Sequence, residues 1–295
     1  MEQPLVSVVI LTYNHENYIG QALDGVLVQK VNFPIEIIVS NDCSTDRTAE
    51  VIDDYVRRME SGERREESVK FRVYHHKQNM GLTANHCWTV KQAKGKYIAY
   101  CDGDDYWTDP YKLQHQMDYM ESHPSCSMCY HNVILECVDK RWLFISPNKR
   151  SGIVSLEEVV KVWAIPTSAV VYRRECIAGK EEEVIKYVNE DYAVEIFMLT
   201  KGECYFDDSI YGVINRRHPT SVSAGMNRKP IKMYEDLIAF LEDAKLWFPE
   251  DKHHCFDEAI ARYESSKQCV IKNQKYPFLK YLRPRTYKRW LLEKC

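Results

Sequence analysis

The chain has 295 residues, of which 45% are hydrophobic and 28% are charged, a composition typical of a globular protein with a sizeable core. Its formal net charge of −3 provides no electrostatic basis for binding nucleic acid. No run of 18 apolar residues occurs, and the first residues lack a basic leader segment. We therefore expect neither a membrane-spanning helix nor a secretion signal.

The 11 cysteines are odd in number and scattered through apolar segments. This distribution favours reduced, buried thiols over a disulfide framework. Cys126 and Cys129 form one close pair, but no second ligand pair follows at a spacing typical of zinc sites. We expect both in a buried strand and place the protein in the reducing cytoplasm.

The first hundred residues alternate between strand-like and helix-like segments. Residues 6–13 are an apolar, β-branched run typical of a strand buried on both faces. Residues 16–28 carry apolar side chains at helical spacing. The alternation continues with strands expected over 35–42, 69–76 and 96–102, and helices over 47–59 and 81–94. This order predicts an α/β fold, with a Rossmann-like, mainly parallel sheet flanked by helices.

The pattern becomes less regular after residue 135. Helices are expected over 155–163 and 190–202, with short strands over 168–173 and 209–216. Two long amphipathic helices, over 228–247 and 251–273, suggest a helical C-terminal extension.

Polar residues follow three of the predicted parallel strands, at 12–14, 41–42 and 102–105. Ligands of open parallel sheets bind beyond the carboxyl ends of the strands. Because these ends share one edge of the sheet, the three clusters are expected to meet in one pocket.

Asp102, Asp104 and Asp105 lie within four residues at the end of an apolar strand. Two carboxylates about 4 Å apart repel by roughly 4 kcal/mol at an effective dielectric constant near 20. A divalent cation such as Mg²⁺ or Mn²⁺ would remove this repulsion, completing its shell with water and substrate phosphates. A second interpretation stays open, in which the aspartates cap a helix that begins near Asp109.

Several segments resemble family 2 glycosyltransferases with the GT-A fold, of the bacterial, inverting type. Those in the first half are 6–23, 37–48, 79–87 and 95–117, in the family's order and spacing. Those in the second half are 165–175, 189–199 and 214–224. One departure is that Asn41 and Cys43 stand where the family more often has Asp and Gly.

The resemblance implies transfer of a hexosyl or N-acetylhexosaminyl group from a nucleoside-diphosphate sugar, most often UDP-linked. The acceptor would be a hydroxyl group of a glycan or lipid-linked glycan, in cell-surface polysaccharide or lipopolysaccharide synthesis. Mn²⁺ or Mg²⁺ would be the cofactor. Residues 1–135 would form the nucleotide-sugar-binding half, 136–225 the acceptor-binding half, and 226–295 a helical extension with a basic tail.

The resemblance also assigns roles to individual residues. Asp104 and His218 match metal ligands, and Asp191 matches the catalytic base. Asp42 would contact the pyrimidine edge, and Asp102 would contact the ribose, or the metal through water. The full set matching the nucleotide pocket is Thr12, Tyr13, Glu16, Asp42, Asn79, Asn85 and Asp102.

Alternatives to these roles remain. Glu190 is the second candidate for the base, and either acid could instead cap a helix. His218 could be an exposed bystander, with Arg216 and Arg217 contacting phosphate.

Two other functions also stay open. A sugar nucleotidyltransferase usually needs a glycine-rich, basic loop after the first strand, which the sequence TYNHENY lacks. A non-catalytic nucleotide-sugar-binding subunit would not need the carboxylates. The basic segment 267–295, with interleaved aromatic residues, suggests peripheral contact with an anionic membrane at the inner face of the plasma membrane, or a helix packed on the domain.

Overall fold

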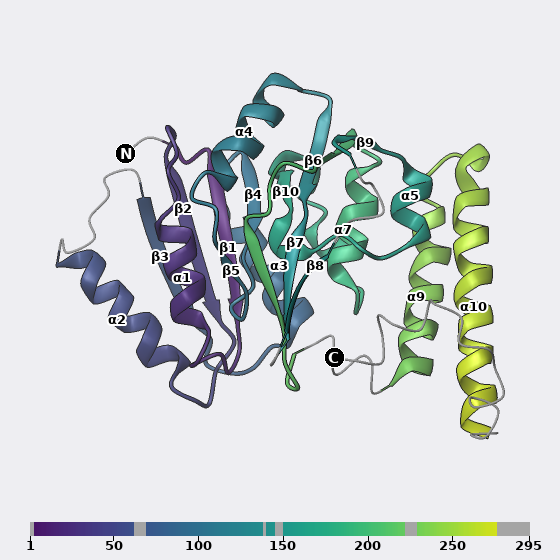
Figure 1. Cartoon of the computed structure of the whole chain (residues 1–295), viewed down its shortest axis with the longest axis horizontal. Helices are drawn as coiled ribbons and strands as arrows, with labels where there is room; N and C mark the ends of the chain where they lie inside the picture. The colour runs from purple at the N-terminus through teal and green to yellow at the C-terminus, as the bar shows by residue number, and fades with distance from the viewer. Residues whose placement is uncertain (1–2, 62–68, 138–139, 145–149, 222–228, 276–295) are drawn as a thin grey trace.

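The structure, a computed structural model, describes residues 3–61, 69–137, 140–144, 150–221 and 229–275 (Figure 1). Its strands form two sheets. The larger sheet has the order β3 (Val69–His75), β2 (Ile35–Asn41), β1 (Val6–Thr12), β4 (Tyr97–Tyr100), β10 (Val171–Arg173), β6 (Cys126–His131), β11 (Glu203–Asp207) and β9 (Gly152–Val154). The smaller sheet has the order β5 (Tyr106–Trp107), β12 (Val213–Arg217), β7 (Val133–Cys137) and β8 (Lys140–Phe144).

Helices connect most of these strands. The α-helices are α1 (Ile19–Leu27), α2 (Thr48–Glu60), α3 (Leu82–Gln92), α4 (Lys112–Ser122), α5 (Leu156–Lys161), α6 (Glu181–Val184), α7 (Glu190–Met198), α9 (Pro230–Lys245) and α10 (His253–Lys275). Three short 3₁₀ turns are η1 (Thr167–Ala169), η2 (Arg174–Cys176) and η3 (Glu250–Lys252). The predicted alternation of strand and helix as far as β4 is confirmed, with boundaries shifted by a few residues.

The larger sheet is mainly parallel, as the sequence predicts. β3, β2, β1 and β4 pair in parallel, while β10 runs antiparallel to both β4 and β6. Every residue of β1 is buried, because helices cover both faces of the sheet. Val8 and Ile10 face a core that includes side chains of α1, α2 and α4. Val9 and Leu11, at alternate positions, face a core that includes side chains of α3 and α7.

Three predicted elements in the second half are wrong in extent, one of them the strand expected over 209–216, which is β12 and begins only at Val213. The helix expected over 190–202 ends at Met198, and β11 begins at Glu203. At Gly202 a Cβ atom would lie 2.3 Å from the Ser125 carbonyl oxygen, so the chain turns there and passes close to β6. The strand expected over 168–173 begins only at Val171, because η1 occupies its first residues. β6 confirms the buried strand expected around Cys126 and Cys129, whose thiols are free.

The helices α9 and α10 lie side by side at one end of the molecule (Figure 1). They continue the core of the α3 and α7 face, to which they contribute Leu237, Phe240 and Phe256. Among the described residues, no helix is both long and apolar enough to cross a bilayer. Residues 276–295, most of the segment expected to contact a membrane, lie outside the described part. The three-part division of the chain stays a prediction.

The order of the strands reverses beside β1, which has β2 on one side and β4 on the other. Such a reversal opens a crevice at the carboxyl ends of the two flanking strands, and ligands of open α/β sheets bind there. The three polar clusters of the sequence follow β1, β2 and β4. The fold therefore places the candidate ligand site at the carboxyl ends of β1, β2 and β4.

Candidate functional site

The segment after β4 continues alongside the end of β1. Cys101 N donates a hydrogen bond to the Val9 carbonyl at 3.1 Å, and Gly103 N donates to the Leu11 carbonyl at 2.9 Å. We call residues 102–105 the acidic turn. A Cβ atom on Gly103 would lie 2.7 Å from Thr12 Cβ and 2.8 Å from the Leu11 oxygen. Only glycine therefore allows the acidic turn to approach β1 this closely.

Asp104 faces two imidazoles. His218 Nε2 lies 2.9 Å from Asp104 Oδ2, and His15 Nε2 lies 4.0 Å from the same oxygen. The His218 ring stacks on Tyr18 with centroids 4.9 Å apart, and its Nδ1 lies 2.9 Å from Thr220 Oγ1. Although burial opposes ionisation of Asp104, the hydrogen bond from His218 and the charge of His15 lower its pKa below the usual value.

The other two carboxyls of the acidic turn accept hydrogen bonds from neighbouring elements, and Asp105 is also buried. Ser168 Oγ lies 2.7 Å from Asp105 Oδ2 and 3.2 Å from Asp102 Oδ2. Asp105 also accepts from Asn215 Nδ2 at 2.7 Å and from Arg216 N at 2.8 Å, which ties the turn to β12. Burial and then repulsion from Asp104 raise the pKa of Asp105 to about 7. Burial and repulsion from the other two carboxyls raise the pKa of Asp102 well above its usual value.

These contacts allow a test of whether a divalent ion fits. Within the described residues, no three His, Cys, Asp or Glu side chains form a ready-made metal cluster. Asp104 and His218 nevertheless offer two metal-ligating atoms in contact, a carboxylate oxygen and an imidazole nitrogen. Mn²⁺ accepts both kinds of ligand, and Mg²⁺ prefers the oxygen. The repulsion within the acidic turn would be relieved by a cation. Asp104 and His218 therefore fit as two ligands of an ion whose other ligands come from elsewhere.

Asp42 organises the loop before α3. Its Oδ1 accepts from Met80 N at 2.7 Å, its Oδ2 accepts from Gly81 N at 2.9 Å, and Asn79 Nδ2 donates to its carbonyl at 3.0 Å. Gly81 has a φ of 81°, a conformation that favours glycine. Asp42 and Asn79 thus lie together, with the Asp42 carboxylate retaining lone pairs for a further donor.

The remaining residues predicted for the nucleotide pocket differ in accessibility. Tyr13, directly after β1, is 44% exposed, whereas the Thr12 hydroxyl is buried and has no hydrogen-bond partner within the described residues. Glu16 accepts a hydrogen bond from Arg47 N at 3.0 Å, at the start of α2. Asn85 is buried and accepts from Ser40 Oγ at 2.5 Å. Tyr13 is therefore accessible to a ligand, whereas the buried Asn85 contacts Ser40 near the end of β2.

Asp191 lies in the first turn of α7, where the local helix geometry lets its Oδ1 accept a hydrogen bond from Tyr192 N at 2.8 Å. Its Oδ2 accepts from Thr167 Oγ1 at 3.1 Å and from Trp163 Nε1 at 3.3 Å. Burial, followed by the charge of Glu190, raises the pKa of Asp191 to about 7 in spite of these three donors. Glu190 is buried, and its Oε1 lies 3.8 Å from His86 Nδ1.

The turn η1 connects Asp191 with the acidic turn. Its Thr167 hydroxyl bonds Asp191, and the next residue, Ser168, bonds Asp102 and Asp105. The structure therefore places Asp191 and the Asp104–His218 pair at the same edge of the sheet.

Sequence reasoning assigned no role to His15, Trp163, Thr167 or Ser168. His15 stands within the polar segment after β1, so its position was a usable signal. Trp163 is the last residue of the helix expected over 155–163, and Thr167 and Ser168 stand in the segment 165–175 that carries the resemblance, but no charge cluster or spacing marks any of the three individually. Arg216 was considered a phosphate ligand, but its guanidinium donates to the Asp104 carbonyl at 2.9 Å and to Gln21.

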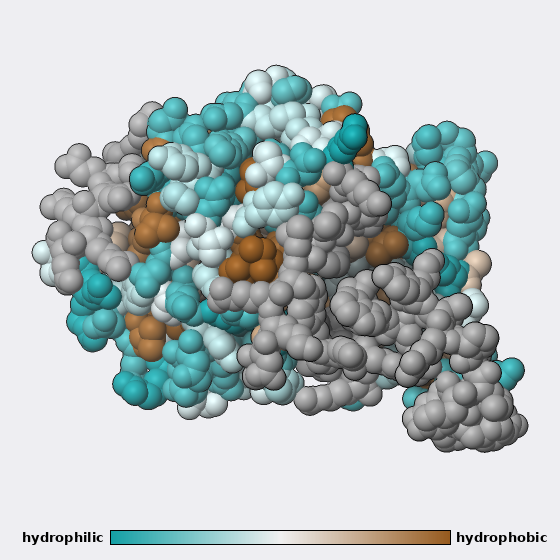
Figure 2. Space-filling model, in the orientation of Figure 1, coloured by the Kyte–Doolittle hydropathy of each residue, from teal (hydrophilic) through white to brown (hydrophobic). Residues whose placement is uncertain are grey.

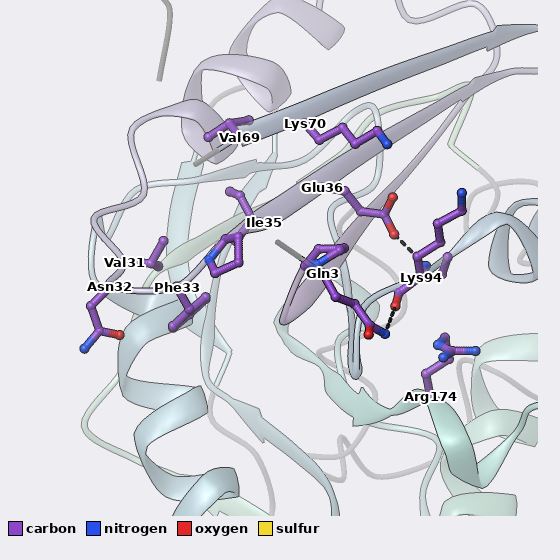
Figure 3. A pocket seen from close by; sticks show the side chains of 13 residues that line it. Gln3, Val31, Asn32, Phe33, Ile35, Glu36, Val69, Lys70, Lys94 and Arg174 are labelled. Carbon is purple, nitrogen blue, oxygen red and sulfur yellow. Dashed lines mark hydrogen bonds between the residues drawn. The ribbon is translucent and has the colours of Figure 1, made fainter. Parts of the chain in front are cut away.

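A separate hollow of about 760 Å³ lies at the opposite end of the strands (Figure 3). Its lining includes Phe33, Ile35, Val69, Lys94 and Arg174, near the starts of β2 and β3. It contains none of the predicted site residues. On the face shown in Figure 2, hydrophobic residues form small separate patches in a largely hydrophilic surface.

The sheet, its reversal beside β1 and the helices on both of its faces match the GT-A fold of solved glycosyltransferases. TarS of S. aureus, solved with UDP-GlcNAc, superposes with a TM-score of 0.67 at 19% identity, covering 88% of this chain and 71% of TarS. The mannosyltransferase PcManGT of Pyrobaculum calidifontis, solved with GDP-Man and Mn²⁺, has a TM-score of 0.59 at 13% identity, covering 98% of this chain and 84% of that one.

The chain belongs to glycosyltransferase family 2: the model of "Glycosyl transferase family 2" matches residues 7–178. An uncharacterised protein of Mycobacterium tuberculosis is 38% identical over 216 residues, which are 70% of this chain and 60% of that protein's length. The Escherichia coli enzyme WfaP, named as a UDP-Glc:α-D-GlcNAc-diphosphoundecaprenol β-1,3-glucosyltransferase, is 28% identical over 77% of this chain and 83% of WfaP. The resemblance seen in the sequence is confirmed at the level of family and fold.

Proposed function

We propose that the chain transfers a hexosyl or N-acetylhexosaminyl group from a UDP-sugar to a hydroxyl group of a glycan or lipid-linked glycan. The product would be a cell-surface polysaccharide or lipopolysaccharide. The name of WfaP supports a UDP-sugar donor and a lipid-linked acceptor, and TarS supports a UDP-sugar. The observation that carries the proposal is η1, which holds Asp191 on one side and the acidic turn on the other.

Asp191 is proposed as the general base. Its pKa of about 7 suits a group that must be ionised before the reaction and must still accept a proton near neutral pH. The base takes the proton of the acceptor hydroxyl while that oxygen attacks the anomeric carbon from the side opposite the diphosphate. The configuration at that carbon is therefore inverted. A positioned base typically contributes about 10²- to 10⁴-fold in rate.

Asp104 and His218 are proposed to hold Mn²⁺ or Mg²⁺, with water and the donor diphosphate as further ligands. When bound there, the ion would offset the negative charge that develops on the departing diphosphate. Tyr13, Asp42 and Asn79 are proposed to line the nucleoside pocket. Contact of residues 267–295 with an anionic membrane at the inner face of the plasma membrane stays a prediction.

Two substitutions test this function. We expect Asp191→Asn to keep UDP binding, because the donor contacts are elsewhere, and to lower transfer at least 10²-fold. We expect Asp104→Ala to abolish the stimulation of turnover by Mn²⁺. The measurements are transfer and donor hydrolysis with UDP-Glc and UDP-GlcNAc, with and without Mn²⁺, and calorimetric binding of UDP.

Asp118→Asn is a matched control, because Asp118 is exposed on α4 and contacts Gln114 Nε2. It should keep wild-type activity. Wild-type turnover in Asp191→Asn would reject the base assignment. A wild-type protein that binds UDP but transfers no sugar would favour a non-catalytic nucleotide-sugar-binding subunit.

A further inference from the structure

The two carboxylate oxygens of Asp191 differ in how many hydrogen bonds they accept. Oδ2 accepts from both Trp163 Nε1 and Thr167 Oγ1, at 3.3 and 3.1 Å. Among the described residues, Oδ1 accepts only from Tyr192 N, at 2.8 Å. Each oxygen of an ionised carboxylate has about two lone-pair sites. Both sites of Oδ2 are therefore in use, and Oδ1 retains one.

We propose that Trp163 and Thr167 are positioning residues that clamp Oδ2 of Asp191, so that Oδ1 is the atom that receives the acceptor's proton. This inference rests on the proposed function of Asp191 as base. In the step, the hydroxyl proton moves to Oδ1 and the hydroxyl oxygen bonds to the anomeric carbon. The bond from that carbon to the donor diphosphate breaks, and its electron pair leaves with the diphosphate. Trp163 and Thr167 act only through Asp191.

Trp163 and Thr167, the two hydrogen-bond donors to Oδ2, are both held in place by the surrounding structure. The Trp163 indole lies nearly parallel to the Tyr192 ring, at 15° with centroids 5.9 Å apart, and packs against the core shared with α9 and α10. Thr167 belongs to η1, where Ala169 N donates to the Pro166 carbonyl at 2.9 Å. The clamp on Oδ2 is thus built into the fold and does not depend on a mobile side chain.

The turn η1 also fixes Asp191, the proposed base, relative to the acidic turn, where the sugar donor is proposed to bind. Ser168, next to Thr167, bonds two carboxyls of the acidic turn, and its carbonyl accepts from Trp107 Nε1 at 3.2 Å. The carbonyl of the following Ala169 accepts from Gln116 Nε2 at 2.9 Å. Consecutive residues therefore hold the base and the acidic turn at a set separation, which preorganises a two-substrate reaction.

Three acidic groups among the described residues interact with the charge of Asp191. Glu190 and Glu195 come from α7 itself, and Asp102 comes from the acidic turn. Burial and the charge of Glu190 raise the pKa of Asp191, while its hydrogen bonds from Tyr192, Thr167 and Trp163 lower it. Loss of either side-chain donor removes a contact that favours the ionised form, so the pKa of Asp191 would rise further.

The experiment compares Thr167→Val and Trp163→Phe, which remove one donor each and keep most of the side-chain volume. We expect kcat to fall about 10-fold or more because the base is misplaced. The donor KM should stay within about twofold of wild type, because neither residue is among those proposed to hold the donor. We expect the acid limb of the pH profile of kcat/KM to move upward by about one pH unit. Thr167→Ser restores the hydroxyl and should restore both the rate and the profile.

Two control variants make the same substitutions, Thr to Val and Trp to Phe, at positions that do not contact Asp191. Thr200→Val deletes a hydroxyl that donates to the Phe197 carbonyl at the far end of α7, and Trp247→Phe alters a ring packed beside Phe197 and Phe240. Both should keep the wild-type profile. If Asp191→Asn is inactive but Thr167→Val and Trp163→Phe keep the wild-type kcat and acid limb, the clamp is rejected. If Asp191→Asn is itself active, the proposed base fails instead.

Discussion

Cys43, in the turn after β2, is a residue whose backbone conformation the sequence only partly predicts. It stands where the family more often has glycine, and its φ of 58° lies in the left-handed region that favours glycine. A non-glycine residue there costs roughly 1–2 kcal/mol. Asn14, in the turn after β1, has a similar φ of 56°, and its side chain accepts from Thr45 N at 2.8 Å. The sequence indicates the unusual residue, but only the backbone shows its strain.

The residues of the site differ in how far they could be predicted. Asp102, Asp104 and Asp105 are readable because a local charge cluster follows an apolar strand. Thr167 and Trp163 act on Asp191 from 24 and 28 residues earlier in the chain, where no charge cluster or spacing marks them individually. Their role depends on how η1 and α7 pack, which propensity and periodicity do not determine.

Glu195 supports a prediction about stability and pH. It is buried in α7, and neither carboxyl oxygen has a hydrogen-bond partner in the described part of the chain. Burial, with the charge of Asp191, raises the pKa of Glu195 well above its usual value. Above the pKa of the unfolded chain, about 4.3, the unfolded state releases this proton and the folded state keeps it. Glu195 therefore lowers the free energy of unfolding progressively as the pH rises toward its folded pKa.

Glu195→Gln removes the ionisable group and keeps the side-chain shape. We expect the variant to be similar to wild type near pH 4 and more stable above it, by about 1.4 kcal/mol per pH unit until the folded pKa is reached. Urea unfolding at pH 4, 5, 6 and 7 measures the difference. A difference that does not change with pH would show that Glu195 ionises normally in the folded protein.

At the scale of elements, strands were predictable where their burial was continuous. β1 and β2 are buried at every position, and their apolar runs are correspondingly clear. The smaller sheet was largely missed, because β5 has two residues and β12 pairs with β7 from a distant part of the chain. Such short strands carry little periodicity of their own, and their pairing is decided by tertiary contacts.

The close approach of the acidic turn to β1 gives a prediction for Gly103→Ala. The added Cβ would meet Thr12, His15 Nδ1 and the Leu11 carbonyl oxygen at 2.7 to 2.8 Å, and the backbone oxygen cannot rotate away. The turn must shift, moving Asp104 relative to His218. We expect a loss of about 1–3 kcal/mol in stability and at least a tenfold weaker affinity for UDP with Mn²⁺. Thermal denaturation and calorimetry measure the two effects.

Gly152→Ala provides the matched control, because a Cβ on Gly152 meets no atom within 4 Å. It should leave both quantities unchanged. If Gly103→Ala binds UDP and Mn²⁺ as tightly as the control, the position of the acidic turn does not determine donor binding.

At the scale of the whole molecule, the C-terminal helices were predicted as an accessory extension. The structure gives them a larger part in the core. Phe240 of α9 is fully buried, and its ring lies 5.5 Å from that of Tyr192 and 4.8 Å from that of Tyr187. Tyr192 directly follows Asp191 in α7. Packing of the helical pair therefore extends to the residue next to Asp191, the proposed general base.

A shared core implies that the helical pair and the sheet unfold together. Phe240→Ala should lower the free energy of unfolding by about 3–5 kcal/mol, because it leaves a cavity among aromatic rings. Leu246→Ala is the control within the same pair of helices, since Leu246 is 77% exposed and should change stability little. In urea, far-UV circular dichroism and tryptophan fluorescence should report one coincident transition for wild type and for Phe240→Ala, with only the midpoint lowered in the variant. Two separated transitions, of which Phe240→Ala moves one, would show that the extension is an independent unit and that its packing does not support Asp191.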